Sequence, residues 1–330
     1  MPQTALPCYV LISVNMKAGR KSPRIRAERL KAALEQRGLE VELHTSLDEV
    51  SQRANELFKD GRLQALVGVG GDGTAAELTN RTIPGVPITL LPSGTANLIA
   101  KHLKLPFNPE KSAEMIANGA TISFDAGKAN GRLFLVMVSA GIDADIVRLV
   151  HAAREESYRK KTKKGAHISY LSYIKPIFKS IKTYKYPQIK TEFASDANSE
   201  ATSTILGKWS FVFNLPRYGW GLPLVPKCTG VDKRLDYCIF QGGKLWTALF
   251  SVACAQLGSM HRLLPNAKLG QGVRFKITAA SDEPNLPAIP YQLDGDPGGR
   301  LPLEIETIPN RFTALGPKKI VERLEKKRVQ

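Results

Sequence analysis

The sequence predicts two domains: a doubly wound, mostly parallel α/β domain followed by a β-rich domain of two sheets. Two observations support this prediction. Strand-like and helix-like segments alternate up to about residue 120, and strand-like segments then follow one another with few helices between them. Alternation is typical of a parallel sheet, whereas consecutive strands favour antiparallel pairing. The predicted boundaries are 1–122, 123–307 and a C-terminal segment, 308–330, that we expect to pack back on the first domain.

In the first domain, hydrophobic periodicity and turn residues define the elements. Apolar runs predict strands at 8–14, 39–44, 64–70 and 86–92, and amphipathic segments predict helices at 23–38, 48–60, 74–81 and 95–103. Ligands of doubly wound sheets bind outside the carboxyl ends of the strands. The segments that follow these strands are therefore the first place to look for a site.

The second half begins with a hairpin signal, Asn130-Gly131, between two apolar runs. Further elements expected there are strands at 208–215, 235–241, 272–280, 288–295 and 300–307, helices near 143–153, 167–184 and 244–257, an exposed loop at 193–203, and a terminal amphipathic helix at 318–329. The scarcity of helices favours an antiparallel, two-sheet arrangement.

Composition narrows the class of protein. Hydrophobic residues make up 43% and charged residues 23%, as in ordinary globular proteins. No apolar run approaches the roughly 20 residues of a spanning helix, and the N-terminus has no positively charged start of a secretory signal, so we expect a cytoplasmic protein. The formal net charge of +17 favours partners that carry phosphate, such as nucleic acid, anionic lipid or a phosphorylated substrate.

The stretch VGVGGDGTAAELTN, residues 67–80, is the most informative motif. It contains GxGxxG, but no acidic residue lies between Glu77 and Glu110 to bind a ribose, and Thr74 follows Gly73 without the lysine of a phosphate loop. Gly70, Gly71 and Gly73 can still turn a strand end into a helix with accessible amides, which form an anion site. Asp72 beside phosphate suggests phosphoryl transfer with Mg²⁺. The alternative is a tight turn whose aspartate caps a helix.

Several motifs in order make the chain similar to a known family. GGDGTAAE (70–77) followed by LLPSGTANLIAKHLKLP (90–106) resembles the catalytic domain of the diacylglycerol kinase and sphingosine kinase family, especially its bacterial lipid-kinase branch. VNMKAG (14–19), SAGIDADIV (139–147) and YQLDGDP (291–297) resemble further motifs of that family. The resemblance covers about residues 8–307 and implies an NAD kinase/diacylglycerol kinase-like fold, with a nucleotide-binding domain before a lipid domain.

The resemblance implies a set of site residues. ATP would lie on Gly70, Gly71, Asp72, Gly73 and Thr74, with Asn15, Thr45 and Thr95 completing the pocket. Thr95 could instead only cap the helix predicted after it. Asp72 would orient the metal and the transferred phosphate, or share the role of base.

The second domain would supply the base. In the family the second acidic residue of a DGE sequence acts toward the lipid hydroxyl, and Asp296, one methylene shorter than glutamate, stands at that position here. The alternative is a hairpin turn, for which Asp294-Gly295 is a strong signal. The bacterial branch also holds a structural Mg²⁺, for which the matching residues are Thr229, Asp232 and Arg234.

A basic segment bears on the partner. Residues 154–185 hold ten Lys or Arg against two Glu, and within 166–187 Ile174, Ile177 and Ile181 share a helical face while Lys175, Lys179 and Lys182 line another. Pro176 predicts a kink or break in this helix. A basic amphipathic helix suits the anionic inner face of a membrane, to which we expect the protein to bind peripherally. The alternative is a helix packed on its own domain. No nucleic-acid motif is recognisable, and association as a homodimer stays open.

Together these observations predict an ATP- and Mg²⁺-dependent lipid kinase that phosphorylates a hydroxyl of diacylglycerol or a similar membrane lipid. One alternative is a kinase of a soluble substrate on the same superfold, similar to NAD kinase. A second is a nucleotide-binding, membrane-associated regulator without turnover, which the aspartate at position 296 keeps open.

Overall fold

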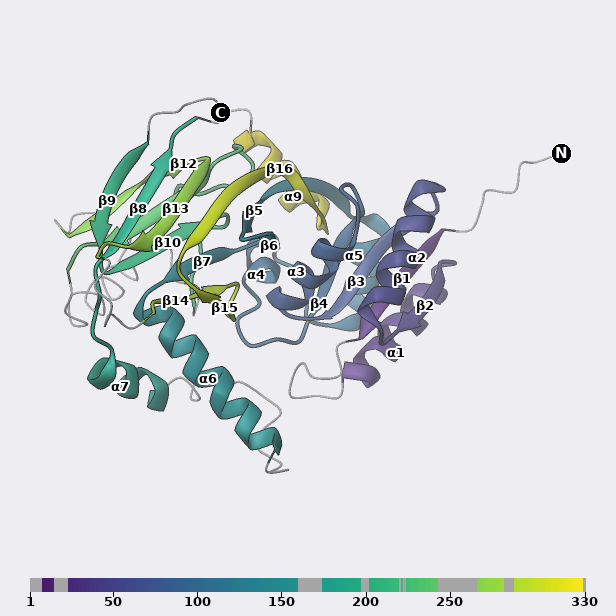
Figure 1. Ribbon diagram of the computed structural model, residues 1–330. Coiled ribbons are helices and arrows are strands. Elements are labelled where there is room, and N and C mark those ends of the chain that lie inside the picture. Colours follow the sequence, from purple (N-terminus) through teal and green to yellow (C-terminus); the bar gives the residue numbers. More distant parts are fainter. Residues whose placement is uncertain are drawn as a thin grey trace. The chain divides into compact units, whose positions relative to one another are not determined.

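The structure is a computed structural model that describes residues 8–14, 23–159, 174–196, 202–219, 221, 224–242, 266–281 and 288–328. The chain forms two compact units (Figure 1). Unit 1 comprises Met1–Phe124 together with Asn310–Gln330, and unit 2 comprises Asp125–Pro309.

Unit 1 is built on a parallel sheet. Its strands are β1 (Tyr9–Val14), β2 (Glu40–His44), β3 (Leu63–Gly70) and β4 (Ile88–Pro92), in the order β2-β1-β3-β4. The C-terminal part of β16 (Leu303–Gly316) runs parallel to β4, with Ala314 opposite Ile88. The side chains of β1 and β3 are almost all buried, as expected for strands covered by helices on both faces. The predicted parallel sheet is therefore confirmed.

Helices cover this sheet in pairs. They are α1 (Pro23–Glu35), α2 (Leu47–Lys59), α3 (Asp72–Arg81), α4 (Leu98–Leu103), α5 (Pro109–Asn118) and α9 (Lys318–Arg328). Helix α1 packs beside α5, and α2 packs beside α3. The terminal helix α9 buries Val321 and Leu324, as its amphipathic pattern predicts. Helix α5 was not expected, although Asn108 as its cap and Pro109 at its first position are regular start signals.

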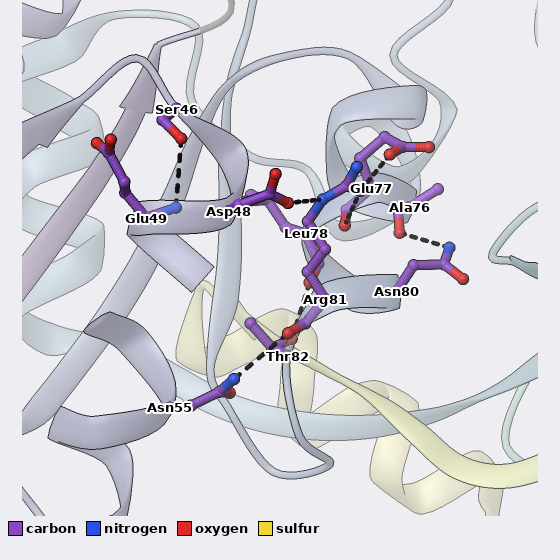
Figure 2. Close-up of polar contacts among 10 residues, drawn as sticks. All are labelled: Ser46, Asp48, Glu49, Asn55, Ala76, Glu77, Leu78, Asn80, Arg81 and Thr82. Carbon is purple, nitrogen blue, oxygen red and sulfur yellow. Dashed lines mark hydrogen bonds and ion pairs between the residues drawn. The ribbon is translucent and has the colours of Figure 1, made fainter. Parts of the chain in front are cut away.

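Polar contacts join α2 to α3 (Figure 2). Ser46 accepts a hydrogen bond from the Glu49 N–H and caps α2. Arg81, in the last turn of α3, donates to Asp48 at 2.8 Å and to Glu77 one turn earlier. These contacts fix the end of α3 that lies away from the glycine stretch.

Unit 2 contains two antiparallel sheets. One has the order β12 (Ala267–Gly272), β11 (Leu235–Phe240), β10 (Trp209–Phe213), β7 (Met137–Ala140), β14 (Pro290–Leu293), β15 (Asp296–Arg300). The other pairs the first part of β16 with β13 (Arg274–Ala279), then β8 (Ile189–Ala194) and β9 (Ser203–Gly207). Side chains from both sheets, among them Val212, Ile239, Phe275 and Ile305, form one apolar core. The predicted two-sheet class is confirmed.

The predicted hairpin is also confirmed. Strands β5 (Ala120–Ala129) and β6 (Arg132–Phe134) pair antiparallel. Asn130 and Gly131 between them have φ angles of 45° and 88°. Two positive φ angles are what a type I′ hairpin turn requires, and asparagine followed by glycine tolerates them best.

Other expectations for this unit were wrong in detail. The segment 193–203 is not simply a loop, because β8 extends to Ala194 and β9 begins at Ser203; residues 197–201 lie outside the described part of the chain. Strand β15 was missed, since DPGGR has low strand propensity and is held in place by its partner β14. The helix expected at 244–257 lies outside the described residues.

In the described part of unit 2, two helices accompany the sheets. Helix α6 (Ile142–Arg159) packs on β14 and β15, and α7 (Ile174–Thr183) packs on α6. Pro176 is the third residue of α7 as described, and because the residues before Ile174 are not described, the kink or break expected at Pro176 stays a prediction. The part of the predicted 167–184 helix before residue 174 lies outside the described residues. In the part of the chain that is described, no helix is both long and apolar enough to cross a membrane.

Candidate active site

The carboxyl ends of β3 and β4 lie side by side. Gly70 and Pro92 are opposite one another, and the N–H of Ser93 donates to the Gly70 carbonyl at 2.9 Å. The two loops that follow touch through glycine: a Cβ on Gly94 would come within 2.8 Å of the Gly71 Cα. Real Cβ atoms do not approach so closely, so a side chain at Gly94 would push these two backbones apart. The glycines therefore allow the loops after β3 and β4 to meet at the carboxyl edge of the sheet.

Asp72 joins these two loops. It is buried, begins α3, and its carboxylate accepts the N–H groups of Leu98 at 2.9 Å and Ile99 at 2.8 Å. It therefore caps α4, a different helix from the one that it begins. Burial raises the pKa of the Asp72 carboxyl, while the two N–H groups and the charge of Lys101 act in the opposite direction. The aspartate is thus a helix cap, although of α4 and not of the helix that follows the glycine stretch, and its part in phosphoryl transfer stays a prediction.

The second loop is shaped by Asn97, which sequence reasoning missed. Its backbone is left-handed, with φ of 50°, and its side chain accepts from the Gly94 N–H and donates to the Gly94 carbonyl. Asparagine is one of the few residues that adopts this conformation readily. Because of this loop, α4 begins at Leu98, so the expectation that Thr95 starts or caps the helix is wrong.

The remaining predicted nucleotide residues that are described follow strands of the same sheet. Thr45 is exposed and directly follows β2. Thr74 is buried in the first turn of α3, where its hydroxyl would lie 2.0 Å from a Cβ placed on Gly70, so glycine is required there. Thr95 is half-buried in the loop between β4 and α4. Asn15 follows β1 but lies outside the described residues.

Arg26, which the motifs did not indicate, supports this edge from α1. Its guanidinium donates to the carbonyls of Pro92 at 2.8 Å and Phe107 at 2.6 Å. Burial is the main cause that lowers its pKa, and the neighbouring charge of Arg29 adds to it. The arginine thereby fixes the end of β4 where the second loop begins.

In unit 2, Asp294 and Gly295 form the turn between β14 and β15, with φ angles of 50° and 91°. The Asp294 carboxylate accepts three N–H groups, from Leu135 at 2.8 Å and from Val136 and Met137 at 2.9 Å. The hairpin reading therefore applies to Asp294, whose role is to hold the turn.

Asp296 follows the turn and begins β15. Its side chain is 42% exposed, and its two oxygens lie 3.6 Å from His151 Nε2 and 4.0 Å from Arg132 Nη2. The two aspartates of the motif therefore differ. Asp294 accepts three backbone hydrogen bonds, whereas the carboxylate of Asp296 is partly exposed on the surface of unit 2.

The expected structural Mg²⁺ site, made of the Asp232 carboxylate and the carbonyls of Thr229 and Arg234, stays a prediction. Asp232 is exposed and accepts the Arg234 N–H at 3.2 Å and the Gln271 amide at 2.9 Å. The same amide donates to Asp236 at 3.3 Å, so Gln271 bridges the two carboxylates. Lys233, with φ of 62°, and Arg234 add positive charge beside Thr229 and Asp232. Among the described residues, no group of three His, Cys, Asp or Glu side chains could hold a metal ion.

Comparisons with known proteins agree with the motifs. Residues 9–129 match the family model described as the diacylglycerol kinase catalytic domain. The diacylglycerol kinase of Staphylococcus carnosus is 23% identical over 266 residues, which cover 78% of each chain. The diacylglycerol kinase of Staphylococcus epidermidis is 23% identical over 299 residues, covering 85% of this chain and 86% of the relative.

A solved structure shows the same fold over the whole length. The crystal structure of a diacylglycerol kinase from Bacillus anthracis superposes with a TM-score of 0.67 at 19% identity, covering 97% of this chain and 100% of that one. The resemblance drawn from the motifs is confirmed: residues 9–129 match the diacylglycerol kinase catalytic domain, and the protein is an enzyme of the lipid kinase type.

Proposed function

We propose that this enzyme transfers the γ-phosphate of MgATP to a hydroxyl of diacylglycerol or a similar membrane lipid. The observation that carries the proposal is the contact between the loops after β3 and β4, where Gly71 and Gly94 bring two backbones together at the carboxyl edge of a parallel sheet. Such edges bind nucleotides in doubly wound folds. The relatives named diacylglycerol kinase support the choice of acceptor.

The proposed nucleotide site is the turn from β3 into α3, residues Gly70 to Thr74, together with Asn15, Thr45 and Thr95. Gly71, the N-cap residue of α3, has no side chain that could cap the helix, so the N-terminus of α3 suits a phosphate group. Mg²⁺ would arrive as part of MgATP and neutralise charge on the transferred phosphate. The hydrogen bonds of Asp72 to α4 favour a positioning role, in which it keeps the two loops together.

The proposed base is Asp296. Its ionised carboxylate would take the proton of the lipid hydroxyl, the hydroxyl oxygen would form a bond to the γ-phosphorus in line, and the bond from that phosphorus to ADP would break. A base must be exposed to its substrate and able to accept a proton, and Asp296 meets both conditions better than Asp294, which accepts three N–H groups.

Purified enzyme, γ-labelled ATP, Mg²⁺ and diacylglycerol in mixed micelles provide the direct test. The proposal expects a labelled lipid, and none when EDTA removes Mg²⁺. Label in NAD would instead support the soluble-substrate alternative. The enzyme could also bind ATP in a filter assay but transfer no label to diacylglycerol, to a total lipid extract or to NAD. That result would contradict kinase activity and would support the alternative of a nucleotide-binding regulator without turnover.

The lysines of α7 support peripheral binding to an anionic membrane surface. Lys175, Lys179 and Lys182 are exposed, whereas Pro176 and Ser180 on another face of α7 are buried. Ser180 donates to Asp145 of α6 at 2.6 Å. The helix thus packs on its own domain through one face and leaves a basic face free for lipid headgroups.

We expect the triple change of Lys175, Lys179 and Lys182 to glutamate to weaken sedimentation with phosphatidylglycerol vesicles at low salt. Each basic residue near an anionic surface contributes about 1 kcal/mol, so vesicle affinity should fall by at least about 100-fold. The control changes Lys318, Lys319 and Lys326 of α9 to glutamate, which alters the net charge equally. Equal loss in both variants would mean that overall charge, and not α7, controls binding.

A further inference from the structure

The turn that carries Asp296 is held from several elements of unit 2. Asp294 bonds the backbone at the start of β7, as described above. The Gly295 N–H donates to Gln292 Oε1 at 2.8 Å, and the Gly295 carbonyl accepts from His151 Nε2 at 3.1 Å. Both polar groups of Gly295 are therefore bonded to side chains, one from β14 and one from α6.

Gln292 is itself fixed by buried polar groups. Its amide nitrogen donates to Ser139 Oγ at 2.9 Å and to Asp143 Oδ2 at 3.2 Å, and Asp143 also accepts from Ser139 and Tyr218. These residues are buried except for Tyr218, which is half-buried. Buried hydrogen-bond networks of this kind restrict their members to one arrangement. The N–H side of Gly295 therefore has a rigid anchor.

His151 is the anchor on the carbonyl side, and it also faces Asp296. A carbonyl oxygen can only accept, so Nε2 of His151 must carry the hydrogen in this contact. The same nitrogen lies 3.6 Å from Asp296 Oδ1, while Arg132 Nη2 lies 4.0 Å from Oδ2. The carboxylate thus has side-chain nitrogens of α6 and β6 on both sides, each beyond hydrogen-bond distance. The His151 side chain is 20% exposed, so it is partly shielded from competing water.

We propose that His151 is a positioning residue for Asp296: through its Nε2–H it fixes the Gly295 carbonyl and thereby the backbone that carries the neighbouring carboxylate. This proposal rests on the proposed function, in which Asp296 is the base. An aspartate has a short side chain, so the direction of its carboxylate depends strongly on the backbone that carries it. Displacing a catalytic group by about 1 Å can lower the rate about 100-fold. A donor that fixes the turn carrying Asp296 therefore has a direct effect on turnover.

The test compares two substitutions of His151. His151→Gln retains an amide N–H near the position of Nε2, whereas His151→Leu keeps an apolar side chain of similar volume without a donor. We expect kcat with diacylglycerol to fall roughly 10- to 100-fold in the leucine variant and to be largely restored in the glutamine variant, with KM for MgATP unchanged in both. Full activity of the leucine variant would overturn the proposal. Equal loss in both variants would also overturn it, because it would mean that the imidazole itself transfers a proton during the reaction.

A measurement without turnover separates this proposal from the proposed function. The ¹⁵N NMR signals of His151 are assigned by comparing the labelled wild type with the glutamine variant. At a pH where the imidazole is neutral, these signals should show the hydrogen on Nε2. The Nδ1–H tautomer would overturn the geometry even if the enzyme is active. His44, whose Nε2 lies 3.2 Å from Glu42 in unit 1, serves as the matched control: His44→Gln and His44→Leu should leave kcat unchanged. If the wild type phosphorylates no lipid while His151 shows the Nε2–H tautomer, the proposed function fails and the geometry stands.

Discussion

Asp296→Asn is expected to lower kcat for lipid phosphorylation by about 10²- to 10⁴-fold, the usual contribution of a general base. The amide has the same shape as the carboxylate but cannot take up the proton of the lipid hydroxyl. The fold should survive, because the turn is held by Asp294, Gln292 and His151, and the Asp296 side chain is 42% exposed. Initial rates with diacylglycerol in mixed micelles measure kcat, and a urea unfolding curve measures the free energy of unfolding.

The matched control is Glu304→Gln, an exposed carboxylate of the same unit whose lysine partner, Lys276, lies 3.9 Å away. It should leave kcat unchanged. Asp296→Glu adds one methylene and restores the residue that the family usually carries at this position, so it should keep activity measurable. Retention of full kcat in Asp296→Asn would remove Asp296 as the base.

The fold class follows from local signals because each unit obeys them consistently. The alternation up to residue 120 predicts the parallel sheet, and Asn130-Gly131 predicts its hairpin because both positions need positive φ. Elements held mainly by their neighbours could not be predicted in this way. Strand β15, with the sequence DPGGR, has little strand propensity and exists because β14 pairs with it.

The residues of the candidate site also differ in whether local sequence signals predict them. The glycine stretch could be located from the sequence because the close approach of Gly71 and Gly94 leaves no room for side chains. The structure therefore requires glycine there, and glycine is recognisable in the sequence. The partners of Asp72 could not be found, since Leu98 and Ile99 lie 26 and 27 residues away and offer backbone N–H groups that any residue has. The same holds for His151, which is 144 residues from the Gly295 carbonyl that it bonds.

We expect Asp72→Ala to impair both stability and use of the nucleotide. Removing the carboxylate leaves the N–H groups of Leu98 and Ile99 buried without their acceptor, which should lower the free energy of unfolding by about 1–3 kcal/mol. The loops after β3 and β4 then lose the side chain that joins them. If they bind MgATP as proposed, kcat/KM for MgATP should fall about 100-fold. Urea unfolding and initial rates at varied MgATP measure the two effects separately.

Asn108→Ala provides the comparison that separates stability from function. Asn108 caps α5 in the same unit by accepting the Lys111 N–H at 3.0 Å, and losing such a cap costs about 1 kcal/mol. We expect this variant to lose stability but to keep its kcat/KM for MgATP, since α5 does not follow the glycine loops. Should Asp72→Ala fail to fold, Asp72→Asn, which keeps one acceptor oxygen, permits the same comparison. A variant of Asp72 that is destabilised yet keeps its kcat/KM would mean that the aspartate is only a helix cap and that MgATP does not depend on the joined loops.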